Sequence, residues 1–160
     1  MNKVTLHNEP FELSGMTIEK NTKLSFKAED KNGIWNIEDI KGKKVISLFP
    51  DINTGICDIQ TQQIAKLAQQ HTDITFISIS TDSVEIQKEW CAAKGLENIL
   101  IVSDDKYKEF QTQTNAYVPK INKLIRGFIL LDENNMIQEI SLNNELVEDP
   151  DYTSLDKWIK

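Results

Sequence analysis

An apolar run that leads through a proline into a helical pattern limits the possible folds of this chain more than any other feature of its sequence. The run VISLF (Val45 to Phe49) has the length and composition of a buried strand, and Pro50 ends it because proline lacks the backbone N–H that a ladder needs. Strand character returns in DITFISIS (residues 73–80). We therefore expect a β-α-β unit. Its helix has one apolar stripe, Ile56, Ile59, Ile64 and Leu67.

The flanking segments extend this unit into a larger sheet. The N-terminal VTLHN and FELSG predict a hairpin that turns around Glu9 and Pro10, and LIRGFILLD and MIQEISL predict another that turns at 133–135. Helices are expected over about 83–94, within DKYKEFQTQT and over DYTSLDKWIK, with a strand at NILIV, from Asn98 to Val102. This order predicts an α/β fold, a mixed central sheet flanked by helices, with an N-terminal β-hairpin.

Composition restricts the class of protein. With 160 residues and no shift in composition, we expect one domain over residues 1–160. No apolar run approaches the roughly 20 residues that cross a bilayer, and the first residues lack the apolar core of a secretory signal. We therefore expect a cytoplasmic protein without a membrane partner. The 25 acidic residues outnumber the 18 basic ones, giving a net charge of −7, and no basic cluster indicates nucleic acid binding.

Cys57 occupies a position at which a thiol is chemically activated. Thr54 is suited to cap the following helix, because its hydroxyl can accept a hydrogen bond from a backbone N–H, and this places Cys57 at the third helical position. A helix N-terminus carries roughly +0.5 elementary charge and unpaired N–H groups, which favour thiolate over thiol. The alternative is that Cys57 is a small buried apolar residue, as most free cysteines are. The backbone donors beside it argue against that interpretation.

The second cysteine, Cys91, lies in the helical segment SVEIQKEWCAAKG. We expect Trp90 in the core and Cys91 at a half-exposed position, because Cys91 projects about 100° away from the face of Trp90. A structural Cys91, in a satellite cluster with Val84 and Ala92, stays open at this point. The expected core face of this helix comprises Ile86, Trp90 and Ala93.

Neither the cysteines nor the two histidines have the spacing of a metal site. His7 and His71 form no HxxxH motif, and the cysteines form no CxxC motif, so we expect no metal and no cofactor. The same absence argues against a Cys-His protease, and His71 at a helix end is expected to be solvated or to interact with the helix dipole. Thiol redox chemistry remains: a thiolate attacks an O–O bond, becomes a sulfenic acid, and condenses with a second thiol. Cys57 and Cys91 fit these two roles in that order.

Arg126 is the only arginine among the 18 basic residues, and it stands at the start of an apolar strand. A guanidinium is planar, always charged and multidentate, so it stabilises a developing oxyanion better than an ammonium does. Arg126 is therefore a candidate for the site. The alternative interpretation is a surface charge on an edge strand.

These residues resemble a known family. Pro50, Thr54 and Cys57 stand in the PxxxTxxC arrangement of the peroxiredoxins, and FPDINTGICDIQT resembles the thiol peroxidase subfamily, also called atypical two-cysteine peroxiredoxins. The likeness extends in order and spacing through KEWCAAKGLENI, VSDDKYKEF, LIRGFILLDENNMI and EDPDYTSLDKWIK. It implies a thioredoxin-like fold, a peroxidatic Cys57 and a resolving Cys91, with Thr54 and Arg126 holding the thiolate and the peroxide. It further implies a disulfide within one chain, reduction by thioredoxin, and a homodimer.

The chain departs from the family pattern at two places. Asp51 and Asn53 stand where the family usually has Ser and Asp, and KLSFKAED replaces its usual Ala-Pro-Asp-Phe. A carboxylate at Asp51 would oppose thiolate formation unless it points to solvent. We expect these changes to affect rate and peroxide preference rather than reaction type. A second hypothesis is a peroxide-responsive redox sensor or chaperone-like binding protein that uses the same disulfide without rapid turnover. The missing CxxC disfavours a general disulfide oxidoreductase.

Overall fold

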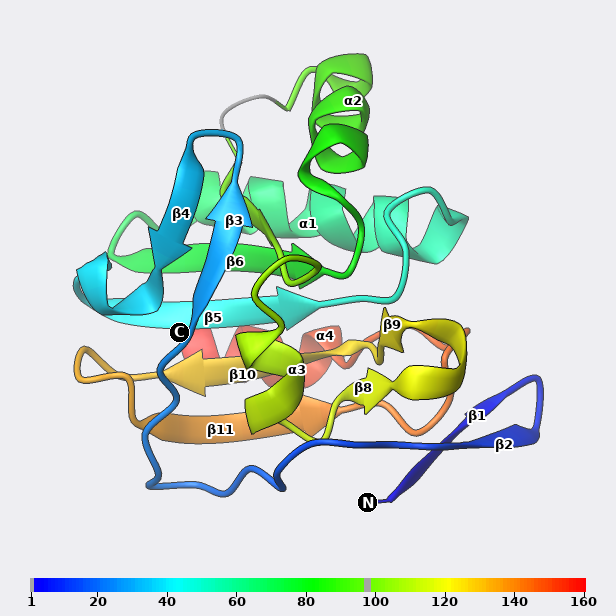
Figure 1. The fold of residues 1–160 in the computed structure, drawn as a ribbon. Coiled ribbons are helices and arrows are strands. Elements are labelled where there is room, and N and C mark those ends of the chain that lie inside the picture. Colours follow the sequence, from blue (N-terminus) through cyan, green and yellow to red (C-terminus); the bar gives the residue numbers. More distant parts are fainter. Residues whose placement is uncertain (1, 97–98) are drawn as a thin grey trace.

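The computed structural model describes residues 2–96 and 99–160, and its centre is a seven-stranded mixed sheet (Figure 1). The strand order is β11-β10-β5-β6-β7-β3-β4. The central strands β5, β6 and β7 are parallel, whereas β10 and β11 on one side and β3 and β4 on the other pair antiparallel. The strands span β3 Lys27–Asp30, β4 Gly33–Asn36, β5 Lys43–Leu48, β6 Ile74–Ser80, β7 Ile101–Ser103, β10 Gly127–Leu131 and β11 Ile137–Leu142.

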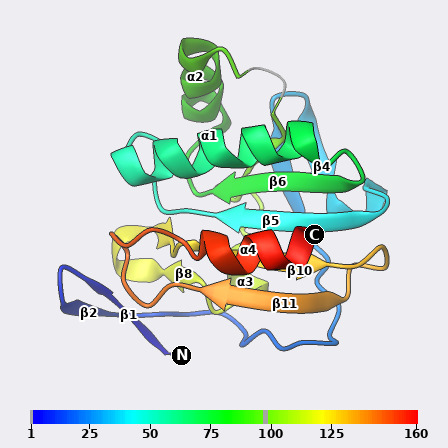
Figure 2. The ribbon, with the colours of Figure 1, turned by 180° about the vertical axis from the view of Figure 1, so that it is seen from behind.

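Helices cover both faces of this sheet. The long α1 (Gly55–Gln70) and the C-terminal α4 (Tyr152–Ile159) lie beside each other on one face, as Figure 2 shows. The short α3 (Glu109–Gln113) lies on the opposite face (Figure 1). Helix α2 (Val84–Lys94) connects β6 to β7 and stands at the top of both views. Two 3-10 turns complete the helical elements, η1 (Ile37–Asp39) and η2 (Pro119–Ile121).

Strand β10 is buried along its whole length and β5 is buried from Lys44 to Leu48, because both faces of the sheet are covered there. On β5, Val45 packs into the cluster under α1 and α4, whereas Ile46 packs into the larger cluster on the opposite face. On β10 the same alternation separates Phe128 from Ile129. This alternation is the period of two that a strand imposes on its side chains. The predicted mixed sheet flanked by helices is confirmed.

The N-terminal hairpin forms, but its turn is not where the sequence predicted it. Strands β1 (Lys3–Leu6) and β2 (Glu9–Glu12) are joined at His7 and Asn8, whose φ angles are 51° and 70°. A two-residue turn with positive φ at both positions matches the twist of the flanking strands. Pro10 is within β2, opposite Thr5, which this two-stranded sheet tolerates because a proline can occupy an edge strand. The predicted turn around Glu9 and Pro10 was therefore wrong.

Most other expected elements are confirmed with shifted ends. Helix α2 begins after Ser83 and ends at Lys94, as predicted, and the turn at 133–135 joins β10 to β11. The strand expected from Asn98 to Val102 is β7, which begins at Ile101; Asn98 itself lies outside the described residues. A second small sheet pairs β8 (Tyr117–Val118) with β9 (Lys123–Leu124) directly before β10.

The buried face of α1 differs from the predicted apolar stripe. Ile64 is buried as expected, but Ile59 is 56% exposed. Polar Gln60 and Thr61 take the inward positions beside Cys57, each with 0% exposure. They are hydrogen-bonded there, so hydrophobicity alone could not identify this face.

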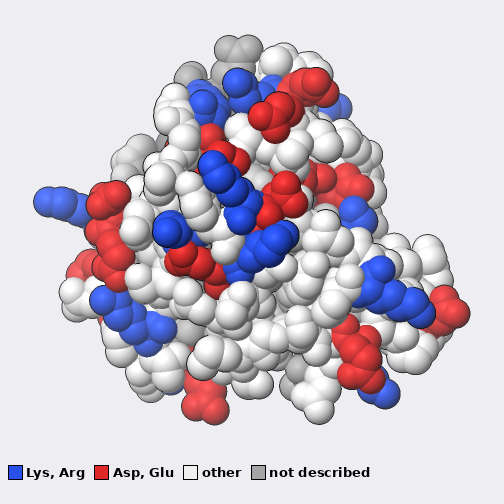
Figure 3. Space-filling view, in the orientation of Figure 1, with Lys and Arg blue, Asp and Glu red and all other residues white. Residues whose placement is uncertain are grey.

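The surface carries charges of both signs. On the face shown in Figure 3, lysine side chains and acidic side chains are interspersed. None of the helices in the described part of the chain is long and apolar enough to cross a membrane.

Candidate active site

The site is built at the junction between β5 and α1. After β5 ends at Leu48, Phe49 and Pro50 are buried, and the chain then bends towards the first turn of the helix. Thr54 is the N-cap residue by position, with φ −91° and ψ 151°. Cys57 is therefore the third residue of α1, as the sequence predicted.

The loop before α1 is held by its own hydrogen bonds. The Thr54 hydroxyl donates to the Asp51 carbonyl at 3.0 Å and makes no cap hydrogen bond to the helix, so the predicted capping role of this hydroxyl was wrong. The Asn53 N–H donates to Asp51 Oδ1 at 2.9 Å. A carboxylate that accepts a bond from two residues onward stabilises a tight turn in this way. Thr54 thus orders the loop that leads to Cys57.

The Cys57 sulfur is completely buried but has polar neighbours. Its exposure is 0%, yet Sγ accepts the Asp51 backbone N–H at 3.5 Å and lies 3.2 Å from Arg126 Nη1. A guanidinium at this distance stabilises a negative charge on sulfur, because the low-polarity surroundings screen the interaction weakly. This arrangement can hold a thiolate that reacts as a nucleophile.

Arg126 is fixed from two further directions. It follows β9 and directly precedes β10, and it is 2% exposed, so the edge-strand surface interpretation was wrong. Nη1 also donates to Gln60 Oε1 at 3.1 Å, and Nη2 donates to the Leu146 carbonyl at 2.9 Å. Nε has no hydrogen-bond partner among the described residues. The guanidinium is therefore anchored while one of its donors stays available.

Gln60 is a site residue that the sequence did not reveal. It is one turn after Cys57 on the same face of α1, and its amide nitrogen donates to Ser47 Oγ at 2.8 Å and to the Leu48 carbonyl at 3.1 Å. These bonds orient its oxygen towards Arg126. The signal that could have identified Gln60 is its spacing of three residues from Cys57, which places both side chains on one face of the helix.

The carboxylate of Asp51 is neutralised by a lysine. Asp51 Oδ2 lies 3.1 Å from Nζ of Lys123 in β9, and the two side chains are 28% and 34% exposed. From the sequence, exposure to solvent was the expected way to keep this charge from opposing a thiolate. The ion pair supplies another, because a nearby cation offsets the field of the carboxylate. Lys123 was not a sequence candidate.

Cys91 is buried rather than half-exposed, which corrects the sequence prediction. It is 7% exposed and belongs, with Cys57, to a cluster that also contains Phe49, Ile52 and Trp90. Both cysteines are free thiols. In contrast, Ile86 is 38% exposed, and the buried face of α2 is Val84, Gln87, Trp90 and Cys91.

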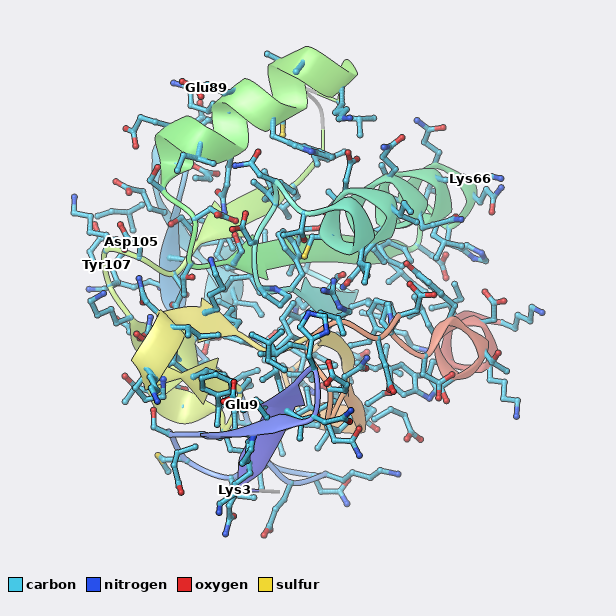
Figure 4. All side chains as sticks on the ribbon, turned by 90° about the vertical axis from the view of Figure 1, so that its right-hand side faces the viewer. Lys3, Glu9, Lys66, Glu89, Asp105 and Tyr107 are labelled. Carbon is cyan, nitrogen blue, oxygen red and sulfur yellow. The ribbon has the colours of Figure 1, made fainter. Side chains whose placement is uncertain are left out.

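The face of α2 was misassigned because Gln87 is polar. Its amide nitrogen donates to Ser80 Oγ at 3.1 Å and to the Val102 carbonyl at 3.0 Å, which satisfies it in the interior. The opposite side of α2 carries charged residues such as Glu89, which lies at the outer surface in Figure 4. Cys91 also contributes to the wall of a cavity of about 490 Å³ between α2 and the β3–β4 turn.

Tyr152 of α4 lies on the same face of the sheet as α1, the helix that carries Cys57. Burial raises the pKa of Tyr152 to about 12; Asp149 and Cys57 also raise it, whereas Arg126 lowers it. Its hydroxyl is buried without a hydrogen-bond partner in the described structure, and its ring packs 5.8 Å from that of Phe128. The phenol stays protonated throughout the neutral range.

The described residues contain no cluster of three or more His, Cys, Asp or Glu side chains that could hold a metal ion. The arrangement that remains is a buried sulfur at a helix N-terminus, a fixed guanidinium and a second thiol in the same cluster.

Comparison with known proteins agrees with this arrangement. The Redoxin family profile matches residues 14–156. The thiol peroxidase of Staphylococcus haemolyticus is 33% identical over 156 residues, which cover 95% of this chain and 94% of that protein. This chain belongs to the thiol peroxidase family. The thiol peroxidase of Oceanobacillus iheyensis is 32% identical over 162 residues, which cover 97% of this chain and 96% of that protein.

Solved structures agree on the fold. The peroxiredoxin-like protein from Aquifex aeolicus superposes with a TM-score of 0.91, at 18% identity, over 99% of this chain and 96% of that chain. The thiol peroxidase from Chromobacterium violaceum superposes with a TM-score of 0.87, at 17% identity, over 99% of this chain and 95% of that chain. The family member is thus a peroxiredoxin-type enzyme with a thioredoxin-like fold, and its family acts by thiol-dependent peroxide reduction.

Proposed function

We propose that this enzyme reduces hydrogen peroxide or an alkyl hydroperoxide through Cys57, forms an intramolecular disulfide with Cys91, and is returned to the dithiol by thioredoxin. The observation that carries the proposal is the 3.2 Å contact between Cys57 Sγ and Arg126 Nη1 inside a buried site. A buried arginine with two fixed acceptors does not serve as a surface charge. Its remaining use is to stabilise negative charge at the sulfur and at the bound peroxide.

In the first step the Cys57 thiolate attacks the distal oxygen of the hydroperoxide. The O–O bond breaks, the sulfur becomes a sulfenic acid, and the alcohol or water leaves with a proton. Arg126 supports this step because its unpartnered Nε–H can donate to the oxyanion that develops. Thr54 and Pro50 support this step indirectly. Thr54 orders the loop before α1 through its hydrogen bond to the Asp51 carbonyl, and the buried Pro50 lies in the segment that connects β5 to this loop.

In the second step the Cys91 thiol attacks the sulfenic sulfur of Cys57. A sulfur–sulfur bond forms, the S–O bond breaks, and water leaves. Membership of both cysteines in one cluster supports this pairing, because a local rearrangement can then bring them together. Thioredoxin supplies two electrons and two protons in the third step and is itself oxidised to a disulfide.

We further infer a homodimer in which each chain forms its own disulfide. A reducing compartment such as the cytoplasm is the proposed location, because both thiols must be regenerated after each cycle. The assembly and the reductant follow from the family rather than from a contact in the structure.

The competing hypothesis is a peroxide-responsive sensor or binding protein that uses the same disulfide without rapid turnover. Peroxide consumption coupled to a thioredoxin system separates the two. We expect Cys57→Ser to abolish coupled turnover with its fold intact, because a hydroxyl fits the site but does not ionise near neutral pH. Circular dichroism checks the fold. Substantial turnover by folded Cys57→Ser would exclude Cys57 as the nucleophile, and a wild type that makes the disulfide but turns over slowly would favour the sensor.

A further inference from the structure

A carboxylate outside the catalytic group binds the loop that leads to Cys57. The Ile52 backbone N–H donates to Asp82 Oδ2 at 2.9 Å. Asp82 stands in the short connection between β6 and α2. The loop before the helix of Cys57 is therefore tied directly to the segment that leads into the helix of Cys91.

This connection continues along a chain of hydrogen bonds to α2. Ser80 Oγ donates to Asp82 Oδ2 at 2.7 Å, and the amide nitrogen of Gln87 donates to Ser80 Oγ at 3.1 Å. Gln87 lies one turn before Cys91 on the same buried face. Asp82 thus links Ile52 to the helical face that carries Cys91.

The side chain of Ile52 reinforces the link. It is 0% exposed and packs in the cluster that contains Cys57, Trp90 and Cys91. A disulfide requires a sulfur–sulfur bond of about 2 Å and a specific geometry at both cysteines. Both thiols are free in this structure, so the cluster must rearrange before the bond can form. Because Ile52 belongs to this cluster, its hydrogen bond to Asp82 is one of the contacts that resist such a movement.

Burial of the Asp82 carboxylate favours opening of the loop. Burial raises the pKa of Asp82 above its ordinary value, and Asp51 raises it further, whereas the hydrogen bonds from Ser80 and Ile52 and the charge of Lys123 lower it. The closed state thus holds a partly dehydrated carboxylate through a few donors. Opening of the loop returns this group to water, so the dehydration cost that opposes closure is recovered.

We propose that Asp82 is a positioning residue that holds the Cys57 loop against α2 and thereby sets the rate of Cys57–Cys91 disulfide formation. This inference rests on the proposed function, in which sulfenic Cys57 must meet Cys91. While the loop is closed, the sulfenic acid faces a second hydroperoxide, which oxidises it to sulfinic acid and is itself reduced to alcohol or water. When the contact breaks, the Cys91 thiol attacks the sulfenic sulfur and water leaves.

The first test needs no peroxide. Amide hydrogen exchange of the reduced protein is measured by NMR for wild type, Asp82→Ala and Asp82→Asn, with Glu89→Gln on the exposed side of α2 as a control. The Ile52 amide should exchange about tenfold faster in Asp82→Ala, because a hydrogen bond to a charged acceptor is lost. Asp82→Asn, which keeps one oxygen acceptor, should lie between. Unchanged protection of Ile52 would overturn the contact whatever the enzyme's reaction is.

The second test follows one turnover. After one equivalent of hydrogen peroxide, quenched samples are mapped for the disulfide, and a parallel set that receives excess peroxide is mapped for sulfinic acid at Cys57. Asp82→Ala should form the disulfide about tenfold faster and accumulate less sulfinic acid, since opening precedes resolution. Ile137→Val, which weakens the cluster on the opposite face, controls for general destabilisation and should leave the partition unchanged.

The outcomes separate the two claims. An unchanged or slower rate in Asp82→Ala, with a wild type that forms the disulfide, overturns the role of Asp82 in resolution. A wild type that forms no such bond rejects the proposed function and with it the effect on rate, while the exchange measurement still decides whether Asp82 holds the loop. If Asp82→Ala does not fold, Asp82→Asn carries both measurements, with a smaller acceleration expected.

Discussion

At the scale of single residues, the position of Arg126 gives the site its character. Its guanidinium contacts the Cys57 sulfur, the Gln60 amide oxygen and the Leu146 carbonyl from a position that is 2% exposed. Three directions of donation match the planar fork of a guanidinium, and a single ammonium cannot reproduce them. The charge is held in place before any substrate arrives, which is the condition for effective electrostatic stabilisation.

Replacement of Arg126 by Lys should therefore slow peroxide reduction by about 100-fold even though the charge is kept. The rate of sulfenic acid formation in a single turnover measures this, with the second-order rate constant as the readout. Lys66→Arg, on the outer side of α1 in Figure 4, is the matched control for exchange of the two cationic side chains. Equal rates for Arg126→Lys and wild type would remove Arg126 from the chemistry.

The site residues that the sequence could predict are those whose types are rare in this chain. One of two cysteines at a helix start and a single arginine were recognisable, because neither has many alternatives in the sequence. Gln60, Asp82 and Lys123 were not, since such residues usually lie on surfaces and only tertiary contacts assign them a role.

At the scale of elements, the ends of helix α2 were predicted more accurately than its buried face. The Ser83 cap and the final Gly95, with φ 67°, gave α2 its correct limits, since both signals are local. Its buried side was assigned wrongly because Gln87 finds partners in Ser80 and Val102. A hydrophobic period cannot identify a buried face that contains polar residues whose hydrogen bonds are made inside the protein.

Helix α3 is a second case, in which a residue that precedes the helix by five positions supplies its cap. Its N-cap residue, Lys108, makes no side-chain cap bond. Instead the Asp104 carboxylate accepts the backbone N–H groups of Phe110 at 3.0 Å and Gln111 at 2.8 Å. Asp104 is 0% exposed. No spacing rule predicts a cap from this position, so the sequence could not assign it.

The buried carboxylate leads to a pH prediction. Burial raises the pKa of Asp104 above its ordinary value of 3.8, although hydrogen bonds from Gln111 and Phe110 lower it. The folded state then binds this proton more tightly than the unfolded chain does. Its contribution to stability is present at acid pH and is lost as pH rises through the raised pKa.

Wild type and Asp104→Asn should reveal this by urea unfolding at several pH values. The free energy of unfolding of wild type minus that of Asp104→Asn should fall from about pH 4 to pH 7, because only the carboxyl titrates. The subtraction cancels the other groups and the constant cost of the amide. A difference that grows with pH would mean that the hydrogen bonds outweigh burial.

At the scale of the whole molecule, the sheet was predictable where its connections are short. The β5-α1-β6 unit and the β10–β11 hairpin follow from local patterns. The hairpin of β3 and β4 joins the sheet through a single pair of residues, Glu29 and Ser103, and nothing in either segment predicts that partner. Such long-range pairing depends on the complete fold.

The fold brings two free thiols into one cluster. Cys57 is bound by Arg126 at the start of α1, and Cys91 is on α2, which a salt bridge of 2.8 Å between Lys94 and Asp58 also ties to α1. Although burial raises the pKa of Asp58, hydrogen bonds from Lys94 and Gln62 bring it below its ordinary value. These contacts hold α1 and α2 together beside the Cys57 sulfur.

The central claim is that oxidation joins Cys57 to Cys91 within one chain. Its most direct test treats the reduced protein with one equivalent of hydrogen peroxide, blocks free thiols and maps peptides by mass spectrometry without reductant. Cys91→Ser is the control, in which sulfenic acid at Cys57 should persist. The account predicts a Cys57–Cys91 peptide from protein that migrates as a monomer in denaturing, non-reducing electrophoresis. A disulfide-linked dimer, or oxidised protein without that peptide, would contradict it.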